Sequence, residues 1–596
     1  MLELDSRSLL SELLRPPAGF HLSHAVGTSF TMTLEAALSI PLAFAGAVEV
    51  DDEVGILGAV RRATQRIDLF AQAGCLGLGT ASELVTVLEP MVHPVRMPGS
   101  RLFHPKVWFL EFERNEERRY RFVCSSRNLT NDRTWDAVIS LDGGPDEDLD
   151  EETVRSNHVM AGLLRWLVDD GRTAPALAPD RADRIARLAE AWAGIRWEHP
   201  DHVRAVRVHA LGIGLPSSDA GPRLGGIRTA VVSPFVTDEG VRLLRSRPGG
   251  ETTLLSRPEA LDRLQPETLQ GLSLRVLDEM VDQALADAET SAVAAGELRG
   301  LHAKIVVHDH AHKQSTLLVG SANATGPAWS NNVEVMVEAE GPKSHLGVEA
   351  VLGSLAPLIE EYTTAGGAQS SQDEEADRRL ESALRELARA RLVVRVNAEG
   401  EYTVTVWAEG AQVVDDRFTL SWRMLSQPDP IPGPLPTADA PYESTALRLE
   451  QITPFVVIAL TDGDGRRRET LLVADLLDDV PGRGDAIVAA HLTEPGAVAR
   501  FIRIMLQDGS LTSIGTGGAG ARSPRRSVLG SRRTVPGCWS FSCGRQPRTG
   551  RGSWTWSGCF GMCQRMRAAA LCRRALPRCG RLSRKRRVCS DDGSRR

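Results

Sequence analysis

The chain has 596 residues, of which 42% are hydrophobic and 25% charged, and its formal net charge is −7. This length allows two or three domains, and the composition is that of a soluble globular protein. The longest apolar run, residues 38–50, contains Pro41 and is too short for a bilayer. Since no basic stretch followed by an apolar core opens the sequence, we expect no secretory signal and a cytoplasmic protein of bacterial type.

The charge is unevenly distributed along the chain. Residues 521–596 carry 19 Arg and one Lys against two Asp, so residues 1–520 have a net charge of about −25. The tail also holds seven of the nine cysteines, without paired CxxC spacing and without histidine. A disulfide or zinc module and a nucleic-acid-binding arm are two interpretations. The mixture of Arg, Gly, Ser, Cys, Trp and Pro is more typical of a GC-rich frame read out of phase, so we expect residues 514–596 to be disordered or frameshifted.

Residues 1–60 mix short helical and loop signals, and a regular alternation follows them. Helical patterns at 54–66 and 81–89 alternate with strand-like runs at 67–74, 101–112, 121–126 and 135–141. This order predicts an α/β layer rather than a helical bundle or a β-sandwich. We expect it to form a first lobe over residues 1–180, followed by a connector over 181–225.

The same order of elements recurs later in the chain. A strand at 227–236 is followed by a helix with Asp238 as its N-cap, and further strands and helices lead to the runs LHAKIVVHD, TLLVGSAN and NVEVMVEA. We therefore expect a second α/β lobe over residues 226–365. After a polar linker and a charged helix, alternating runs such as YTVTVWA and FTLSWRM predict a small β-rich accessory domain over 366–513.

Residues 300–325 place four polar groups at strand positions two apart. His302 and Lys304 share one face of a strand, because residues i and i+2 project to the same side. The chain returns as TLLVG and brings Ser321 and Asn323 to the top of the neighbouring strand. All four groups can donate hydrogen bonds to anionic oxygens, and an imidazole can also act as a nucleophile. The pattern predicts a phosphate site with a reactive centre.

A second copy of the pattern lies in the first lobe. FHPKVWFLE carries His104 and Lys106, and VCSSRNLT carries Ser126 and Asn128. A carboxylate follows each copy, and we expect each one, on the next strand, to accept a hydrogen bond from an imidazole Nδ1 and fix its tautomer. These carboxylates are Asp136 and Glu334.

HAKIVVHD followed by GSAN matches the HxKx4D…GSxN signature, so the chain resembles the phospholipase D superfamily, and its duplication resembles the two-lobed members. The resemblance covers roughly residues 60–365. It implies two α-β-α lobes related by a pseudo-twofold axis, with both motifs facing one cleft. It also implies that one histidine attacks phosphorus to form a phosphohistidine while the other protonates the leaving oxygen. Phosphate is then held by the lysines and asparagines of both motifs, Lys106, Asn128, Lys304 and Asn323, and neither a metal nor another cofactor is required.

Two positions of the first motif depart from the signature. Glu111 stands where the second motif has Asp309, and Ser125 replaces the glycine found at Gly320. A side chain at Ser125 is expected to hinder a close approach of the backbone to phosphate. Because all histidines, lysines and asparagines are present, we expect an active enzyme.

Other polar residues near the motifs have simpler interpretations. His308, His310 and His312 alternate in HDHAH, which suits either metal ligands or an exposed hairpin loop. Ser126 and Ser321 either contact phosphate or only shape a turn. Trp108 and Trp135 are expected to pack in the core rather than to stack on bases.

Three functions remain open at this point. The first is a nuclease acting on DNA or RNA, of the kind associated with bacterial defence, to which a partner such as a helicase delivers the substrate. The second is a lipid-cleaving phospholipase or transphosphatidylase, which the lack of a basic amphipathic segment disfavours. The third is a non-catalytic subunit that binds nucleic acid. The acidic body is unfavourable for broad nucleic-acid affinity, because such affinity depends on neutralising phosphates.

Overall fold

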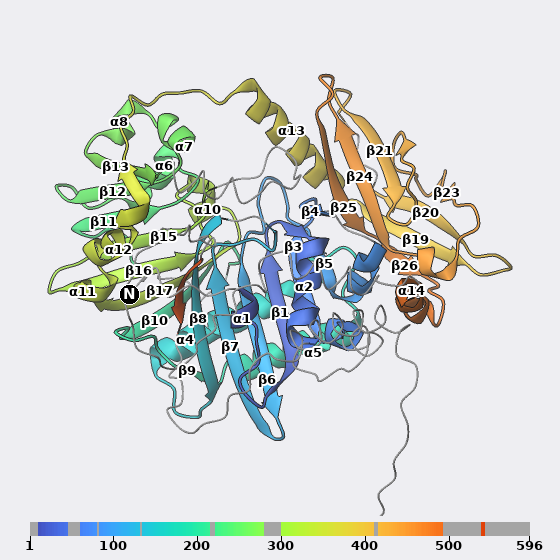
Figure 1. Cartoon of the computed structure of the whole chain (residues 1–596), viewed down its shortest axis with the longest axis horizontal. Coiled ribbons are helices and arrows are strands. Elements are labelled where there is room, and N and C mark those ends of the chain that lie inside the picture. Colours follow the sequence, from blue (N-terminus) through green and yellow to red (C-terminus); the bar gives the residue numbers. More distant parts are fainter. Residues whose placement is uncertain are drawn as a thin grey trace, which may run out of the picture. The chain divides into compact units, whose positions relative to one another are not determined.

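Figure 1 shows the computed structural model of the chain. The structure describes residues 10–45, 60–79, 83–131, 134–214, 221–278, 300–410, 415–492 and 538–542. The chain divides into a unit Met1–Gly544 and a unit Arg545–Arg596, and the second unit lies outside the described residues. All of the following concerns the first unit. Within the described residues, no helix has the length and apolar character needed to cross a membrane.

The first large sheet contains nine strands and carries the first motif. Its main path runs β14-β8-β7-β6-β1-β3-β5, and β9 and β27 also pair with β8. β1 runs parallel to β3, and β3 parallel to β5, whereas β1, β6, β7 and β8 pair antiparallel. The bounds are β1 (His21–Ser29), β3 (Ile67–Gln72), β5 (Val92–Val95), β6 (Val107–Arg114), β7 (Glu117–Ser125), β8 (Thr134–Pro145), β9 (Ile195–Trp197), β14 (Gly300–Leu301) and β27 (Cys538–Ser542).

The second large sheet repeats this order with eight strands and carries the second motif. Its path is β10-β17-β16-β15-β11-β12-β13-β18, so β11, β12, β13, β15, β16 and β17 correspond to β1, β3, β5, β6, β7 and β8. The two lobes predicted from the sequence are therefore confirmed as a duplicated α/β arrangement. The bounds are β10 (Ala205–Leu211), β11 (Arg228–Val232), β12 (Glu251–Leu255), β13 (Leu272–Leu277), β15 (Ile305–Asp309), β16 (Gln314–Gly320), β17 (Glu334–Pro342) and β18 (Ile359–Glu361).

Helices accompany both sheets. α4 begins at the N-cap Asp150, whose carboxylate accepts a hydrogen bond from the Thr153 amide, and it buries an apolar face that ends at Leu167. The helices of the first lobe are α1 (Leu10–Leu13), α2 (Leu34–Ala45), η1 (Glu83–Met91), α4 (Glu151–Leu167) and α5 (Pro179–Trp192). Those of the second are α6 (Asp238–Leu244), α7 (Pro258–Asp262), α8 (Pro266–Leu269), α10 (Gly326–Ser330), α11 (Lys343–Leu346), α12 (Val348–Leu355) and η3 (Ala356–Leu358).

One hydrophobic cluster joins the two sheets. Phe109 and Cys124 of the first lobe belong to the same buried cluster as Val307, Val319 and Val335 of the second. Trp108 lies in a separate cluster of the first lobe, where a Cβ on Gly27 would come within 2.6 Å of the Trp108 ring. Both tryptophans near the first motif are buried, Trp135 in the shared cluster and Trp108 against Gly27. The lobes thus share one core.

A buried ion cluster ties three strands of the first lobe to a helix. The Asp68 carboxylate on β3 accepts hydrogen bonds from His24 on β1 at 2.8 Å and from His93 on β5 at 2.9 Å. Arg181 on α5 completes the cluster at 2.6 Å. Burial acts to raise the pKa of Asp68, but these three partners hold it well below its usual range.

The C-terminal domain is β-rich, as predicted. Two four-stranded sheets, β23-β20-β19-β26 and β22-β21-β24-β25, enclose one core with α13. Residues such as Phe455 and Val473 also pack into the apolar cluster of the first lobe. The smaller elements are β2 (Met32–Thr33), β4 (Leu76–Gly77), α13 (Gln372–Leu387), β19 (Arg391–Asn397), β20 (Thr403–Glu409), β21 (Thr419–Met424), β22 (Ile431–Pro432), β23 (Tyr442–Glu443), η4 (Leu449–Gln451), β24 (Phe455–Thr461), β25 (Arg467–Val473), β26 (Asp475–Leu477) and α14 (Arg483–Leu492).

Three parts of the chain differ from the expected outline. The first lobe contains strand β1 in a region where only helical and loop signals were expected. The sequence did not indicate this strand because His24 and two serines interrupt its alternation of apolar residues. Residues 181–225, expected to connect the lobes, supply β9 to the first sheet and β10 to the second. Of residues 514–596, the structure describes only β27, which pairs with β8, and the rest of that prediction falls outside the described residues.

Candidate active site

Both motif histidines stand immediately before a central strand and are held by the opposite lobe. The His104 amide donates a hydrogen bond to the Val333 carbonyl, and the His302 amide donates one to the Trp135 carbonyl, each at 2.9 Å. The preceding residues pair in the same crosswise manner, with Phe103 bridged to Val333 and Leu301 to Trp135. The residues that lead into each motif therefore pair in parallel with a segment of the opposite lobe. This pairing brings the two motifs close together.

Each imidazole pairs with the carboxylate of the other lobe. His104 Nδ1 lies 2.8 Å from Glu334 Oε2, and His302 Nδ1 lies 2.8 Å from Asp136 Oδ1. The sequence predicted the right carboxylates and the right imidazole atom but placed each carboxylate on the next strand of the same lobe. The carboxylates do lie on those strands, β8 and β17, but each one contacts the histidine of the opposite lobe, because Glu334 and Asp136 follow directly after the residues that pair with the opposite motif. An Nδ1–H donated to a carboxylate leaves Nε2 as the reactive nitrogen of each ring.

The motif serines support the carboxylates. Ser126 Oγ donates to Asp136 Oδ1 at 2.9 Å and accepts from the Ala137 amide at 2.9 Å. Ser321 makes the matching pair of contacts, donating to Glu334 Oε2 and accepting from the Val335 amide at 3.0 Å. The sequence left open whether the serines contact phosphate or shape a turn. These bonds favour a different role. Each serine orients the carboxylate that orients an imidazole.

The two lysines lie buried beside the histidines. Lys106 Nζ donates to the His104 carbonyl at 3.0 Å, and Lys304 Nζ donates to the His302 carbonyl at 2.8 Å and lies 3.5 Å from His302 Nε2. Burial lowers the pKa of Lys106 well below its usual value, and the nearby Lys304 ammonium lowers it further. Glu334 and Asp136 oppose this effect. An anion bound beside the Lys106 amine would oppose these effects and favour its charged form.

The same environment keeps the histidines neutral. Burial lowers the pKa of His104 well below its usual value, and Lys106 and Lys304 add to the effect. Burial also lowers the pKa of His302, followed by the Lys304 ammonium, while Asp136 opposes both. A neutral imidazole has a lone pair on Nε2, which a nucleophile needs.

The two carboxylates are not equivalent. Burial acts to raise the pKa of Asp136, but His302, Arg127 and Lys304 hold it well below its usual range. The Arg127 guanidinium lies 3.8 Å from Asp136 Oδ2, and the matching position of the second motif is Ala322. Burial raises the pKa of Glu334 to about 8. His302 is therefore paired with a firmly ionised carboxylate, and His104 with one that takes up a proton near neutral pH.

The motif asparagines are held through their amide oxygens. Asn128 Oδ1 accepts from the Thr31 amide at 3.4 Å, and Asn323 Oδ1 lies 3.5 Å from Ser233 Oγ. Thr31 and Ser233 both lie in the segments that follow β1 and β11, although they are not equivalent positions. Because Oδ1 accepts these hydrogen bonds, the NH₂ group of each side chain points away from them. An NH₂ group is the donor that a phosphoryl oxygen needs.

Several residues of the site were not predicted. Ser29 ends β1 and Ser233 directly follows β11, and each hydroxyl accepts from the amide of the residue after a motif asparagine, Leu129 or Ala324. The signal that could have revealed them is the repeated serine with a nearby aromatic residue in GTSFT and VVSPFV. Phe30 follows Ser29, and its ring centroid lies 4.9 Å from that of His104.

The departures from the family signature have local explanations. Asp309 lies at the far end of β15, where it accepts hydrogen bonds from Ser315 and from the Val348 amide. A Cβ on Gly320 would come within 2.1 Å of the Val335 carbonyl, so the second motif needs glycine for strand packing. Ser125 Oγ donates to the Arg127 carbonyl at 3.4 Å.

The histidines of HDHAH are not arranged as metal ligands. His308 is buried and contacts Thr229, His310 contacts Thr316, and His312 lies exposed in the turn. Among the described residues, no group of three or more His, Cys, Asp or Glu side chains has the geometry of a metal site.

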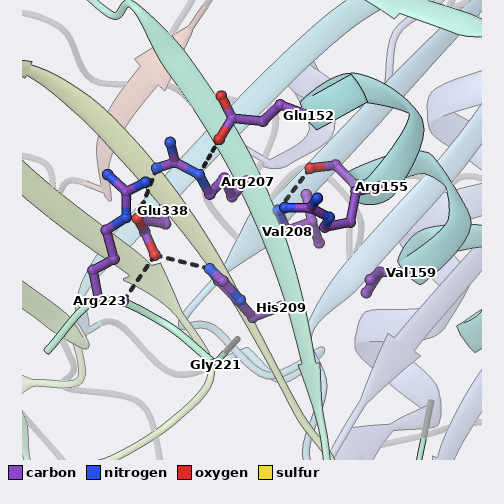
Figure 2. A pocket seen from close by; sticks show the side chains of 10 residues that line it. Glu152, Arg155, Val159, Arg207, Val208, His209, Gly221, Arg223 and Glu338 are labelled. Atoms are coloured by element: carbon purple, nitrogen blue, oxygen red, sulfur yellow. Dashed lines mark hydrogen bonds and ion pairs between the residues drawn. The ribbon is translucent and has the colours of Figure 1, made fainter. Parts of the chain in front are cut away.

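A separate pocket lies between α4 and β10 (Figure 2). It is lined by Arg155, Arg207, Arg223 and His209, together with Glu152 and Glu338. His209 and Arg207 each lie 2.9 Å from the Glu338 carboxylate, and Figure 2 shows Arg207 also directed at Glu152. The pocket contains none of the motif residues, and its cations are paired with carboxylates.

Comparisons with solved structures found similarity at low sequence identity. Phosphatidylserine synthase from Haemophilus influenzae Rd KW20 is 12% identical, with 64% of this chain and 89% of that one covered and a TM-score of 0.32. Yeast tyrosyl-DNA phosphodiesterase is 12% identical over 55% and 85% of the two chains, with a TM-score of 0.33. Polyphosphate kinase from Porphyromonas gingivalis is 13% identical over 63% and 50%, with a TM-score of 0.31. No protein-family model and no curated protein matches the sequence, and these values assign no activity.

Proposed function

We propose that the chain is a phosphodiesterase that works through a phosphohistidine, and that its substrate is a nucleic acid. The observation that carries the proposal is the crosswise pairing of His104 with Glu334 and of His302 with Asp136. Two imidazoles with their Nδ1 atoms engaged, beside two buried lysines, form a site suited to attack on a phosphodiester anion.

In the first step, His104 Nε2 bonds to phosphorus while the bond from phosphorus to the leaving oxygen breaks. His302 donates its Nε2 proton to that oxygen. In the second step, a water molecule gives a proton to His302 Nε2 and its oxygen bonds to phosphorus, while the bond between phosphorus and His104 breaks. Lys106 and Lys304 hold the non-bridging oxygens together with the amides of Asn128 and Asn323.

The difference between the two carboxylates supports this division of roles. An acid needs a protonated imidazole, which the ionised Asp136 beside His302 stabilises. A bound phosphodiester anion opposes the charge of Lys304, so we expect His302 to take up its proton when the substrate binds. His104 stays neutral, as a nucleophile must, because burial lowers its pKa and its partner Glu334 loses its negative charge more readily than Asp136 does.

The test is the hydrolysis of bis(4-nitrophenyl) phosphate in the presence of EDTA. We expect turnover by the wild-type chain and its loss in His104→Ala and in His302→Ala. His158→Ala is the matched control, because His158 lies exposed on α4. Turnover that stops with the chelator, or that survives either motif substitution, would reject the mechanism.

The substrate class needs a second test. Single-stranded DNA, duplex DNA and phosphatidylcholine vesicles are incubated with the enzyme, and we expect cleavage of DNA without release of choline. The reverse result would favour a lipid-cleaving enzyme, and salt-sensitive binding without turnover would favour a non-catalytic subunit. The acidic body favours delivery of the nucleic acid by a partner protein, such as a helicase of a bacterial defence system.

A further inference from the structure

The second lobe carries an aromatic side chain in contact with a cation at the edge of the site. Phe235 is the aromatic member of the exposed large hydrophobic residues in the described part of the chain, with 38% of its surface exposed. The Arg257 guanidinium lies 5.3 Å from the centroid of its ring. An arginine at this distance from an aromatic ring is a cation–π pair.

Both partners are fixed to the second motif. Arg257 donates two hydrogen bonds to the carbonyl of Leu301, the residue before His302, at 3.2 and 2.9 Å. The Phe235 carbonyl accepts from Ser233 Oγ at 2.7 Å, and that oxygen lies 3.5 Å from Asn323. The pair is thus anchored through the backbone beside the histidine and through the serine beside the asparagine, so it has a set position with respect to the reacting groups.

The first lobe arranges its aromatic ring differently, because its Phe30 ring lies 4.9 Å from the His104 ring and 5.8 Å from Lys106 Nζ. When the parallel strand pairs of the two lobes are aligned by register, Gln72 at the end of β3 corresponds to Arg257, which lies two residues after the end of β12. Gln72 is buried, and its Oε1 accepts from the Phe103 amide at 2.8 Å, so it anchors the residue before His104 as Arg257 anchors the residue before His302. Thr31 stands where the second lobe has Phe235, since each carbonyl accepts from the serine two residues earlier. The lobes therefore differ in that Phe235 is an exposed ring paired with Arg257, whereas the ring of the first lobe, Phe30, lies against His104.

We propose that Phe235 and Arg257 form a stacking platform for an unpaired nucleobase of the substrate, which makes single-stranded nucleic acid the preferred substrate class. This inference rests on the proposed function. An exposed ring backed by a guanidinium suits the face of a flat base, and such contacts are tolerant of sequence because every base has a π-face. A base within a duplex is already stacked and paired, so it is not available to this platform. One ring also buries too little apolar surface to hold an acyl chain.

The platform lies on the side of His302, the proposed acid. The base that it holds then belongs to the nucleotide on the leaving-group side of the scissile phosphate. Cleavage should accordingly depend on a base at that one position and tolerate its absence on the other side.

The experiment measures binding separately from turnover. Oligonucleotides of single-stranded DNA carry one 2-aminopurine or one abasic site at successive positions, and they are bound to protein with the His104→Ala substitution, which removes the proposed nucleophile so that no cleavage occurs. We expect fluorescence quenching at one position, and a roughly ten-fold loss of affinity when Phe235→Ala is added, which is within the range for one stacked base. With the abasic site at that position, Phe235→Ala should have no effect.

Leu243→Ala is the matched control, because Leu243 is another exposed hydrophobic residue of the same lobe. It should leave the affinity unchanged. Arg257→Gln copies the residue of the first lobe and should weaken binding in the same direction as Phe235→Ala. Equal affinities of the Phe235→Ala and parent proteins, an equal effect on the abasic oligonucleotide, or no binding of single strands would each overturn the inference. None of these results bears on the hydrolysis of bis(4-nitrophenyl) phosphate, so the proposed function would fail by its own test.

Discussion

Replacing Asp136 with Asn tests the crosswise pairing directly. The carboxylate accepts from His302 Nδ1 at 2.8 Å, Ser126 Oγ at 2.9 Å and Thr134 Oγ1 at 2.8 Å. An amide of the same shape keeps one acceptor but places a donor opposite one of these three donors. It also removes the negative charge that stabilises a protonated His302.

The magnitude follows from these contacts. A hydrogen bond to a charged group contributes about 1.5–3 kcal/mol, which corresponds to roughly 10–150-fold in rate if it is lost in the transition state. General acid catalysis as a whole contributes about 10²–10⁴-fold. We therefore expect Asp136→Asn to lower kcat for bis(4-nitrophenyl) phosphate by about 10²-fold or more.

The assay compares kcat, KM and the melting temperature of three proteins. Asp142→Asn is the matched control, because Asp142 lies on the same strand β8 but pairs with the partly exposed Arg121 at 2.6 Å. It should retain kcat and lose at most about 1 kcal/mol of stability. If Asp136→Asn turns over at the wild-type rate, or if the two variants lose activity only in proportion to unfolded protein, then the opposite lobe does not orient His302 and the reasoning is refuted.

Further predictions follow from the other carboxylates and from strand packing. Since burial raises the pKa of Glu334 to about 8, its charge is lost as the pH falls, and kcat/KM should decline below that pH. Glu334→Gln should give a low rate without this decline, and Glu334→Asp should restore the pH dependence. A rate that rises toward acid pH would contradict the assignment. Gly320→Ala should destabilise the fold by about 1–3 kcal/mol in urea unfolding, because the new Cβ meets the Val335 carbonyl, and an unchanged midpoint would show that the strand can shift. Asp68→Asn should cost about 3–5 kcal/mol, since it leaves a buried arginine without its carboxylate, and a loss below 1 kcal/mol would contradict a tightly coupled cluster.

The sequence predicted the groups of the site better than their partners. His104, Lys106, His302 and Lys304 could be recognised because two short motifs repeat with the same spacing. The pairing of His302 with Asp136 could not, because it joins residues 166 apart through a contact between lobes. Local periodicity determines which face of a strand a residue occupies, but it does not determine which strand end lies opposite it.

The unpredicted parts of the fold have a related cause. β1 contains His24, whose buried ring depends on Asp68, so its strand character becomes visible only when the ion cluster is assembled. Phe235 and Arg257 belong to no motif, and neither residue type is unusual in a loop. Their proximity arises from two separate attachments to the second motif, which only the three-dimensional arrangement reveals.

The exchange of carboxylates between lobes makes catalysis sensitive to the docking of the two sheets. Hydrogen bonds weaken steeply once donor and acceptor separate beyond about 3.5 Å, so a slippage of one lobe by little more than an ångström would disconnect both imidazoles together. In a denaturant titration, turnover should consequently vanish at a lower concentration than circular dichroism or tryptophan fluorescence. The loss of turnover would then report the separation of the two lobes at denaturant concentrations where each lobe is still folded.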